Sequence, residues 1–179
     1  GKIDDLISYR LNREKLIKLK KTSNINIKKQ NYKIMVFENL LDGSEHFALI
    51  KGNIKKNKKP RVRVISSNIV KNYLMGENLP NSFNQTIEHF KNHKDCVLIF
   101  IRDTNLKSVS ETLKGYKSKN FYKKGEDKLI KNYGIGAQII KSLNIRNMIL
   151  VTRSKKKVVG LEGYGIKIIK QEIIKWKYA

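Results

Sequence analysis

Hydrophobic positions in the first part of the chain follow two different spacings. A spacing of three to four residues predicts an amphipathic helix over residues 3–20, with apolar positions at Ile3, Leu6, Ile7, Leu11, Leu16 and Leu19. Residues 20–31 are polar and have no period, which predicts a linker or loop. Short β-type runs predict strands over residues 32–37, 47–50 and 61–65, with the turn signal Asp42-Gly43 between the first two and a lysine-rich loop over 54–60.

After residue 80 helical and strand patterns alternate. The predicted helices cover residues 82–93, with Ser82 as N-cap, 109–116, 127–143 and 158–164, the last ended by Gly165. The predicted strands cover residues 96–101, 148–152 and 166–169, and the first of them is apolar throughout, as a fully buried strand is. The pattern predicts an α/β (α+β) fold, a mixed sheet with flanking helices.

Composition narrows the class of protein. The chain has 179 residues and 40% hydrophobic side chains, enough for the core of one domain. A single cysteine excludes an intramolecular disulfide and a zinc site of three thiolates. Apolar runs are far shorter than the roughly 20 residues of a membrane span, and the first residues lack a secretory-signal pattern. We therefore expect a cytoplasmic protein without a membrane partner.

The net charge of +24 has two interpretations. It favours a polyanionic partner such as a nucleic acid. However, 32 Lys, 24 Ile and 18 Asn together occupy 74 positions, and all three residue types have A/T-rich codons. Because the lysines are spread along the whole chain, a lysine-coated surface produced by genomic composition is the favoured interpretation, with nucleic-acid binding as the alternative.

Three stretches resemble segments of a known family, and a fourth stands at a matching place in the chain. Residues 132–140 (NYGIGAQII) are similar to the RDYGIGAQIL segment of the GTP cyclohydrolase II family of riboflavin biosynthesis, and residues 148–165 resemble its LLTNNPRKIxGLEGYG segment. Residues 45–52 resemble the family's early strand, and residues 61–67 (RVRVISS) stand where its RVHSEC strand belongs. The resemblance implies a GTP cyclohydrolase II-like domain over residues 32–179.

The same resemblance implies a degenerate active site. In the family a zinc-bound water opens the guanine ring, and three cysteines hold the zinc. Here the first cysteine position is Asn68, residues 79–81 supply neither of the others, and Cys96 fits a small core residue. His89 and His93 are spaced i,i+4, but no glutamate follows His89, so a solvated helix face is favoured over a metal site. We expect no cofactor: the family's zinc and magnesium are both lost.

The substrate contacts of the family are also changed. Its glycine-rich EGRGIGL loop corresponds to residues 103–109, which contain no glycine. Its catalytic Asp and Arg correspond to Leu129 and Lys131. Four other positions match functional residues of the family.

Tyr116 aligns with the family's catalytic tyrosine and is expected to be vestigial. The other three positions, Arg63, Thr152 and Lys157, are the expected nucleotide- or phosphate-binding residues. Each also has a purely structural interpretation. Tyr116 would be a core aromatic and Arg63 an exposed strand residue, whereas Thr152 would end a strand and Lys157 would be a surface lysine. Together they predict a residual anion pocket.

The N-terminal segment suggests a partner. Residues 3–10 (IDDLISYR) resemble the end of the dihydroxybutanone-phosphate synthase domain in fused synthase/cyclohydrolase proteins, and the chain begins with Gly1. We therefore expect residues 1–31 to be a helix and linker, and the chain to be a fragment of a fusion; an ordinary surface helix is the alternative. The favoured hypothesis is an inactive domain that supports such a synthase in cis or trans, with a homodimer and a phosphorylated ligand as further expectations. The alternatives are a divergent active GTP cyclohydrolase and a basic RNA-binding module.

Overall fold

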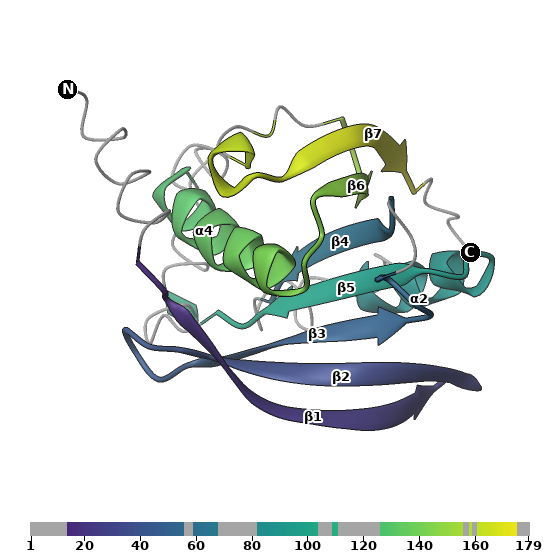
Figure 1. The fold of residues 1–179 in the computed structure, drawn as a ribbon, viewed down its shortest axis with the longest axis horizontal. Helices are drawn as coiled ribbons and strands as arrows, with labels where there is room; N and C mark the ends of the chain where they lie inside the picture. The colour runs from purple at the N-terminus through teal and green to yellow at the C-terminus, as the bar shows by residue number, and fades with distance from the viewer. Residues whose placement is uncertain are drawn as a thin grey trace.

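The computed structural model describes residues 14–55, 59–67, 82–103, 109–110, 126–155, 158 and 161–174. Seven strands form one sheet in the order β1-β2-β3-β5-β4-β6-β7 (Figure 1). The strands are β1 (Ile17–Ile27), β2 (Gln30–Asn39), β3 (Glu45–Lys51), β4 (Arg61–Ser66), β5 (Cys96–Ile101), β6 (Asn147–Thr152) and β7 (Lys167–Ile173). The predicted mixed α/β fold is confirmed.

The sheet has an antiparallel half and a parallel half. Strands β1, β2, β3 and β5 pair antiparallel, whereas β5, β4, β6 and β7 pair parallel. Short turns join β1 to β2 and β2 to β3, and Gly43 lies in the second turn with a φ of 68°. Strand β5 follows β3 only after β4 and α2. Parallel strands need crossovers, which is why helices appear in the second half of the chain.

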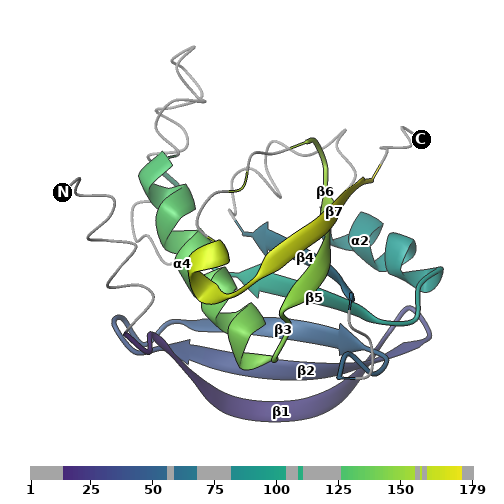
Figure 2. The ribbon, with the colours of Figure 1, turned by 45° about the horizontal axis from the view of Figure 1, so that its top comes forward.

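Two helices cover opposite faces of the sheet. Helix α4 (Glu126–Ser142) packs on one face in the larger apolar cluster, and α2 (Ser82–Lys91) packs on the other with Ile87 and Phe90. Figures 1 and 2 show the two helices on either side of the strands. Because both faces are covered, the central strand β5 is buried at nearly every position, as its apolar sequence predicts.

Gly136 on α4 faces the sheet. A Cβ added at Gly136 would lie 3.4 Å from Ile101 Cδ1 and 3.5 Å from Val64 Cγ1, which is ordinary van der Waals distance. This position of α4 therefore packs on side chains of β4 and β5, with room for no more than a small side chain.

The N-terminal predictions need a correction. Residues 17–27 are neither helix nor linker; they form β1, which pairs with β2 along its length, and Lys28 and Lys29 make the turn with positive φ. Residues 1–13 lie outside the described residues. Leu16 and Ile17 are buried, and Leu16 N donates a hydrogen bond to Gln138 Oε1 on α4, so this segment is part of the sheet domain.

Two later helices agree with the sequence predictions. The helices predicted over 82–93 and 127–143 are α2 and α4. The helix predicted over 158–164 is confirmed only as a 3-10 helix, η3 (Glu162–Tyr164), which ends at Gly165 with a φ of 71°; Val158 is not helical, and residues 159 and 160 lie outside the described residues. Of the helix predicted over 109–116, residues 109 and 110 are helical and the rest lie outside the described residues. Among the described residues, no helix combines the length and apolar character needed to cross a membrane.

Candidate ligand-binding site

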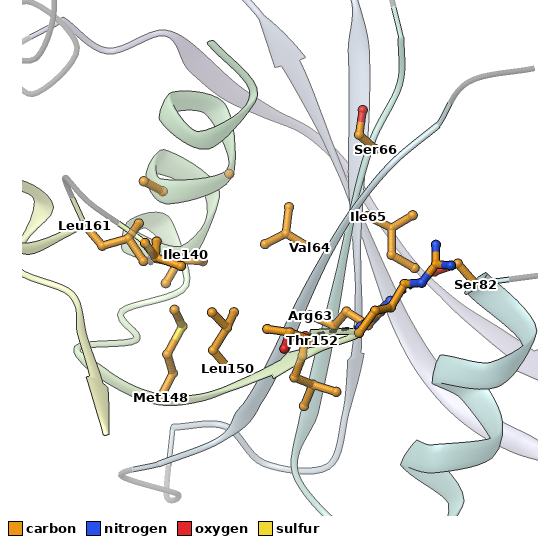
Figure 3. Close-up of a pocket in the computed structure, with 15 residues that line it drawn as sticks. Arg63, Val64, Ile65, Ser66, Ser82, Ile140, Met148, Leu150, Thr152 and Leu161 are labelled. Atoms are coloured by element: carbon orange, nitrogen blue, oxygen red, sulfur yellow. Dashed lines mark hydrogen bonds between the residues drawn. The ribbon is translucent and has the colours of Figure 1, made fainter. Parts of the chain in front are cut away.

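A cavity opens where two parallel strands separate. Strands β4 and β6 pair at only two positions, Arg61 with Ile149 and Val62 with Leu150. Beyond Val62 the strands are no longer paired, and a cavity of about 220 Å³ lies there. Its walls come from β4, β6, α4, the start of α2 and the chain after β6 (Figure 3).

The cavity has one apolar and one polar side. Val64, Ile140, Met148, Leu150 and Leu161 belong to or pack against the core cluster on the α4 side of the sheet. The polar groups in its lining belong to Arg63, Ser66, Ser82, Thr152 and Arg153. Pockets for drug-sized ligands usually have volumes of about 300–1,000 Å³. The described walls therefore enclose only part of a ligand of that size, and the polar groups would hold that part.

Arg63 is the most unusual group in this lining. It is only 5% exposed, so the interpretation as an exposed strand residue is wrong. Its Nη1 donates to Val151 O at 3.3 Å and its Nη2 to Ser82 Oγ at 3.0 Å, whereas its buried Nε has no hydrogen-bond partner among the residues that the structure describes. Figure 3 shows its side chain reaching toward Ser82.

The charge of Arg63 has no carboxylate partner among the described residues, since none of their acidic groups lies at ion-pair distance from its guanidinium. Burial, and secondarily the charge of Arg153, lowers the pKa of Arg63 to about 10, so the group stays protonated at neutral pH. A buried, protonated guanidinium with an unused donor favours an anion in the cavity.

Of the other predicted site residues, the structure describes Thr152 but not Lys157 or Tyr116. Thr152 lines the same cavity and is buried, but its hydroxyl already donates to Ser154 O at 2.8 Å, so it fixes the end of β6. Lys157 and Tyr116 lie outside the described residues, and their roles stay predictions. Ser82 and Arg153 also line the cavity, and sequence reasoning missed both in this role.

Comparison with known proteins decides the family. The family model for GTP cyclohydrolase II matches residues 18–173. The chain belongs to the GTP cyclohydrolase II family.

Relatives of this family include longer proteins. The chain is 28% identical to riboflavin biosynthesis protein RibBA of Chlorobium phaeovibrioides, over 94% of this chain and 44% of that protein. It is 32% identical to the monofunctional riboflavin biosynthesis protein RIBA 2, chloroplastic, of Arabidopsis thaliana, over 93% of this chain and 36% of that protein. The chain thus spans less than half the length of these relatives.

A solved structure shares the fold. RibBX, a two-domain 3,4-dihydroxy-2-butanone 4-phosphate synthase from A. baumannii, is similar with a TM-score of 0.68 and 21% identity. The match covers 97% of this chain and 44% of that chain. At this identity the likeness shows a common fold.

The zinc of the GTP cyclohydrolase II family does not fit the cysteine content of this chain. Cys96 is the single cysteine, and it is fully buried in β5, as predicted for a core residue. Burial raises the pKa of its thiol to about 12, so it is not a thiolate at neutral pH. Asn68 and residues 79–81, which stand at the family's cysteine positions, lie outside the described residues.

Two histidines face a glutamate that the sequence analysis missed. His89 and His93 were expected on a solvated helix face, but their side chains are only 20% and 22% exposed. Oε1 of Glu172 on β7 lies 3.0 Å from His89 Nε2 and 3.5 Å from His93 Nε2. Burial and the neighbouring Arg61 lower the pKa of His93. Glu172 is the single acidic residue in the sequence of β7, and this isolated acid in a strand is the signal that could have identified it.

Proposed function

We propose that this chain is a GTP cyclohydrolase II-type domain of riboflavin biosynthesis without cyclohydrolase activity. In this proposal it binds a phosphorylated ligand and supports a dihydroxybutanone-phosphate synthase, either fused to it or associated with it. The observation that carries the loss of activity is the single, buried, protonated Cys96. A three-thiolate zinc site cannot form, and without a metal-bound hydroxide the hydrolysis of the guanine ring loses its nucleophile.

The proposed ligand contacts centre on Arg63. Its uncompensated charge and the free donor on Nε would bind a phosphate oxygen, with Lys157 as the second expected cation. Each charge-assisted hydrogen bond contributes about 1.5–3 kcal/mol, and ordering the ligand opposes this gain. We therefore expect dissociation constants in the millimolar to upper micromolar range.

The synthase partner is supported by the relatives. The similar proteins named RibBA are more than twice as long as the matched segment, and the solved protein of the same fold is described as a two-domain synthase. Residues 3–10 resemble the end of a synthase domain, in agreement with a fused or closely associated synthase. We propose the cytoplasm as its setting, in keeping with a reduced cysteine.

The test of lost activity is formate release from GTP. Purified chain, supplied with Zn²⁺ and Mg²⁺, should release formate no faster than buffer. Turnover that a chelator abolishes and Zn²⁺ restores would overturn the proposal. The synthase role is tested separately: a synthase from the same genome should co-elute with the chain in gel filtration or gain thermal stability when mixed with it, and neither effect would occur if the role is wrong.

A second candidate function is a divergent, active GTP cyclohydrolase. It is favoured by the two histidines and the glutamate near α2, since such residues can hold a catalytic zinc. Against it, none of these three residues is among those that line the cavity. Formate release that is lost in Glu172→Gln would favour this candidate over the inactive domain.

A further inference from the structure

His89, His93 and Glu172 bring three metal-ligating atoms together. These atoms all lie within 4.8 Å of one another, and the imidazole ring centres are 4.9 Å apart. The residues come from the end of α2, the turn after it and strand β7, so the fold places them together from distant parts of the chain. We propose that they form a binding site for a divalent transition-metal ion, with Zn²⁺ as the best fit and water as a further ligand.

The separations are compatible with a shared metal ion. Zn–N and Zn–O bonds of about 2.0–2.1 Å at tetrahedral angles place ligand atoms about 3.3–3.4 Å apart. The two histidine nitrogens lie 3.0 and 3.5 Å from Glu172 Oε1, on either side of that value. An ion can therefore enter with small side-chain shifts.

One nitrogen of the cluster has an electrostatic contact but no hydrogen bond. Within the described part of the chain, the buried Nε2 of His89 makes no hydrogen bond of good geometry, although Glu172 Oε1 lies 3.0 Å away at ion-pair distance. Arg61 Nε donates to Oε2 of the same carboxylate at 3.0 Å. This bond fixes the carboxylate and leaves Oε1 directed to the two imidazoles, as hydrogen bonds from outer residues do for metal-bound carboxylates.

The ligand set selects the kind of metal. Two imidazoles and one carboxylate suit Zn²⁺, Ni²⁺, Co²⁺ or Cu²⁺, whereas Mg²⁺ and Ca²⁺ prefer oxygen ligands alone. Arg61 and Lys51, whose Nζ binds Phe90 O at the end of α2, add positive charge nearby. This charge, and the net charge of +24, disfavour loosely held cations, so measured binding would need these specific ligands.

The proposed site differs from the family's zinc site in residues and chemistry. It uses no cysteine, and it joins α2 to the edge strand β7. Figure 2 shows α2 lying near the end of β7. A bound ion would cross-link these two elements, so its main expected effect is on stability. The inference does not rest on the proposed function.

The test uses the full chain without a polyhistidine tag, titrated with Zn²⁺ against a competing chromophoric chelator. We expect one equivalent to bind, and Glu172→Gln and His93→Gln each to weaken the affinity at least 10-fold. The matched control is Glu88→Gln, which removes the same charge next to His89 in the sequence from a carboxylate whose partners in the described part of the chain are Lys28 and Lys91. It should change the affinity less than 2-fold. Equal effects of Glu172→Gln and Glu88→Gln would overturn the site.

Two measurements on the wild-type chain keep the test independent of whether variants fold. Zn²⁺ at 100 times its dissociation constant should raise the Tm by about 5–10 °C. Co²⁺ should give the visible absorption of four- or five-coordinate nitrogen and oxygen ligation, without a thiolate charge-transfer band. No Tm shift with a weak six-coordinate Co²⁺ spectrum would overturn the proposal, and a thiolate band would assign the metal to Cys96 instead.

Discussion

Two arginines on one strand lie in opposite surroundings. Arg61 and Arg63 are two residues apart on β4 and so point to the same face of the sheet, the α2 face. Arg61 donates to Glu172 and is partly exposed. Arg63 is buried beside the cavity, and its partners in the described ranges are a carbonyl and a hydroxyl. Within these ranges, β4 thus carries one arginine with a carboxylate partner and one without.

The difference indicates what each arginine does. A paired, partly exposed arginine stabilises the fold modestly by holding strands and helix together. A buried charge without a counter-ion costs free energy of folding, and replacing it with an apolar side chain of similar size is often neutral or stabilising. The proposed anionic ligand would offset this cost at Arg63, whereas Glu172 offsets it at Arg61.

The largest expected effect is on ligand affinity. Arg63→Met should weaken binding of pyrophosphate or GTP by about 10- to 100-fold, because one or two charge-assisted hydrogen bonds of about 1.5–3 kcal/mol are lost. Isothermal titration of the variants would measure it. Arg61→Met is the matched control and should change the affinity less than 3-fold; a larger loss there would mean that general positive charge, and not the cavity, attracts the ligand.

The second effect is on stability, and here we expect Arg61→Met to have a larger effect than Arg63→Met. Arg61→Met should lower the free energy of unfolding by about 1 kcal/mol, because Glu172 then loses a hydrogen-bond donor in a half-buried place. Urea unfolding monitored by circular dichroism would measure this. Adding Glu172→Gln should restore part of the loss. The comparison fails if Arg61→Met is neutral while Arg63→Met is strongly destabilising.

Cys96 gives an independent probe of this stability order. Its thiol is fully buried, and its pKa is raised to about 12, so a thiol reagent at pH 8 should react with it only in molecules that open. We expect labelling of native wild-type chain to be slow, and about 5-fold faster in Arg61→Met, since about 1 kcal/mol corresponds to that factor. Rapid labelling of the native wild type would contradict the burial of this strand.

The smallest expected effect concerns the surface lysines. Lys157→Ala should weaken binding of the phosphorylated ligand several-fold more than Lys58→Ala, which removes the same charge at a position without a match to the family's phosphate contacts. Titrations at two salt concentrations would separate the two, because screening weakens general attraction most. Equal effects would show that Lys157 does not take part in the pocket.

Sequence reasoning predicted the central elements well and missed the edge. The sequences of strands β4, β5 and β6 contain β-branched or apolar runs that predict strands, because these strands are covered on both faces of the sheet. Strand β1 is exposed at nearly all its positions, from Lys18 to Asn26, and is held by backbone pairing with β2. Such pairing leaves no apolar period in the sequence, and the spacing of Leu16 and Leu19 imitated a helix.

Only those residues of the candidate site that match a family motif were predicted from the sequence. Matching positions pointed to Arg63 and Thr152, which do line one cavity. The burial of Arg63 was not predictable from the alternation in RVRVIS, because the charged positions face α2, whose contacts are set by the fold. Glu172 was missed for a similar reason: strand β7 brings it to His89 from far along the chain.

Thermal melts of wild type, Arg61→Met and Arg63→Met, each with and without pyrophosphate, test the central claim most directly. The account predicts that Arg63→Met melts at the same or a higher temperature than wild type and that pyrophosphate no longer shifts its Tm. Arg61→Met should melt lower but keep the full shift. The account is contradicted if Arg63→Met melts well below wild type and is still stabilised by pyrophosphate, since Arg63 would then serve the fold and not a ligand.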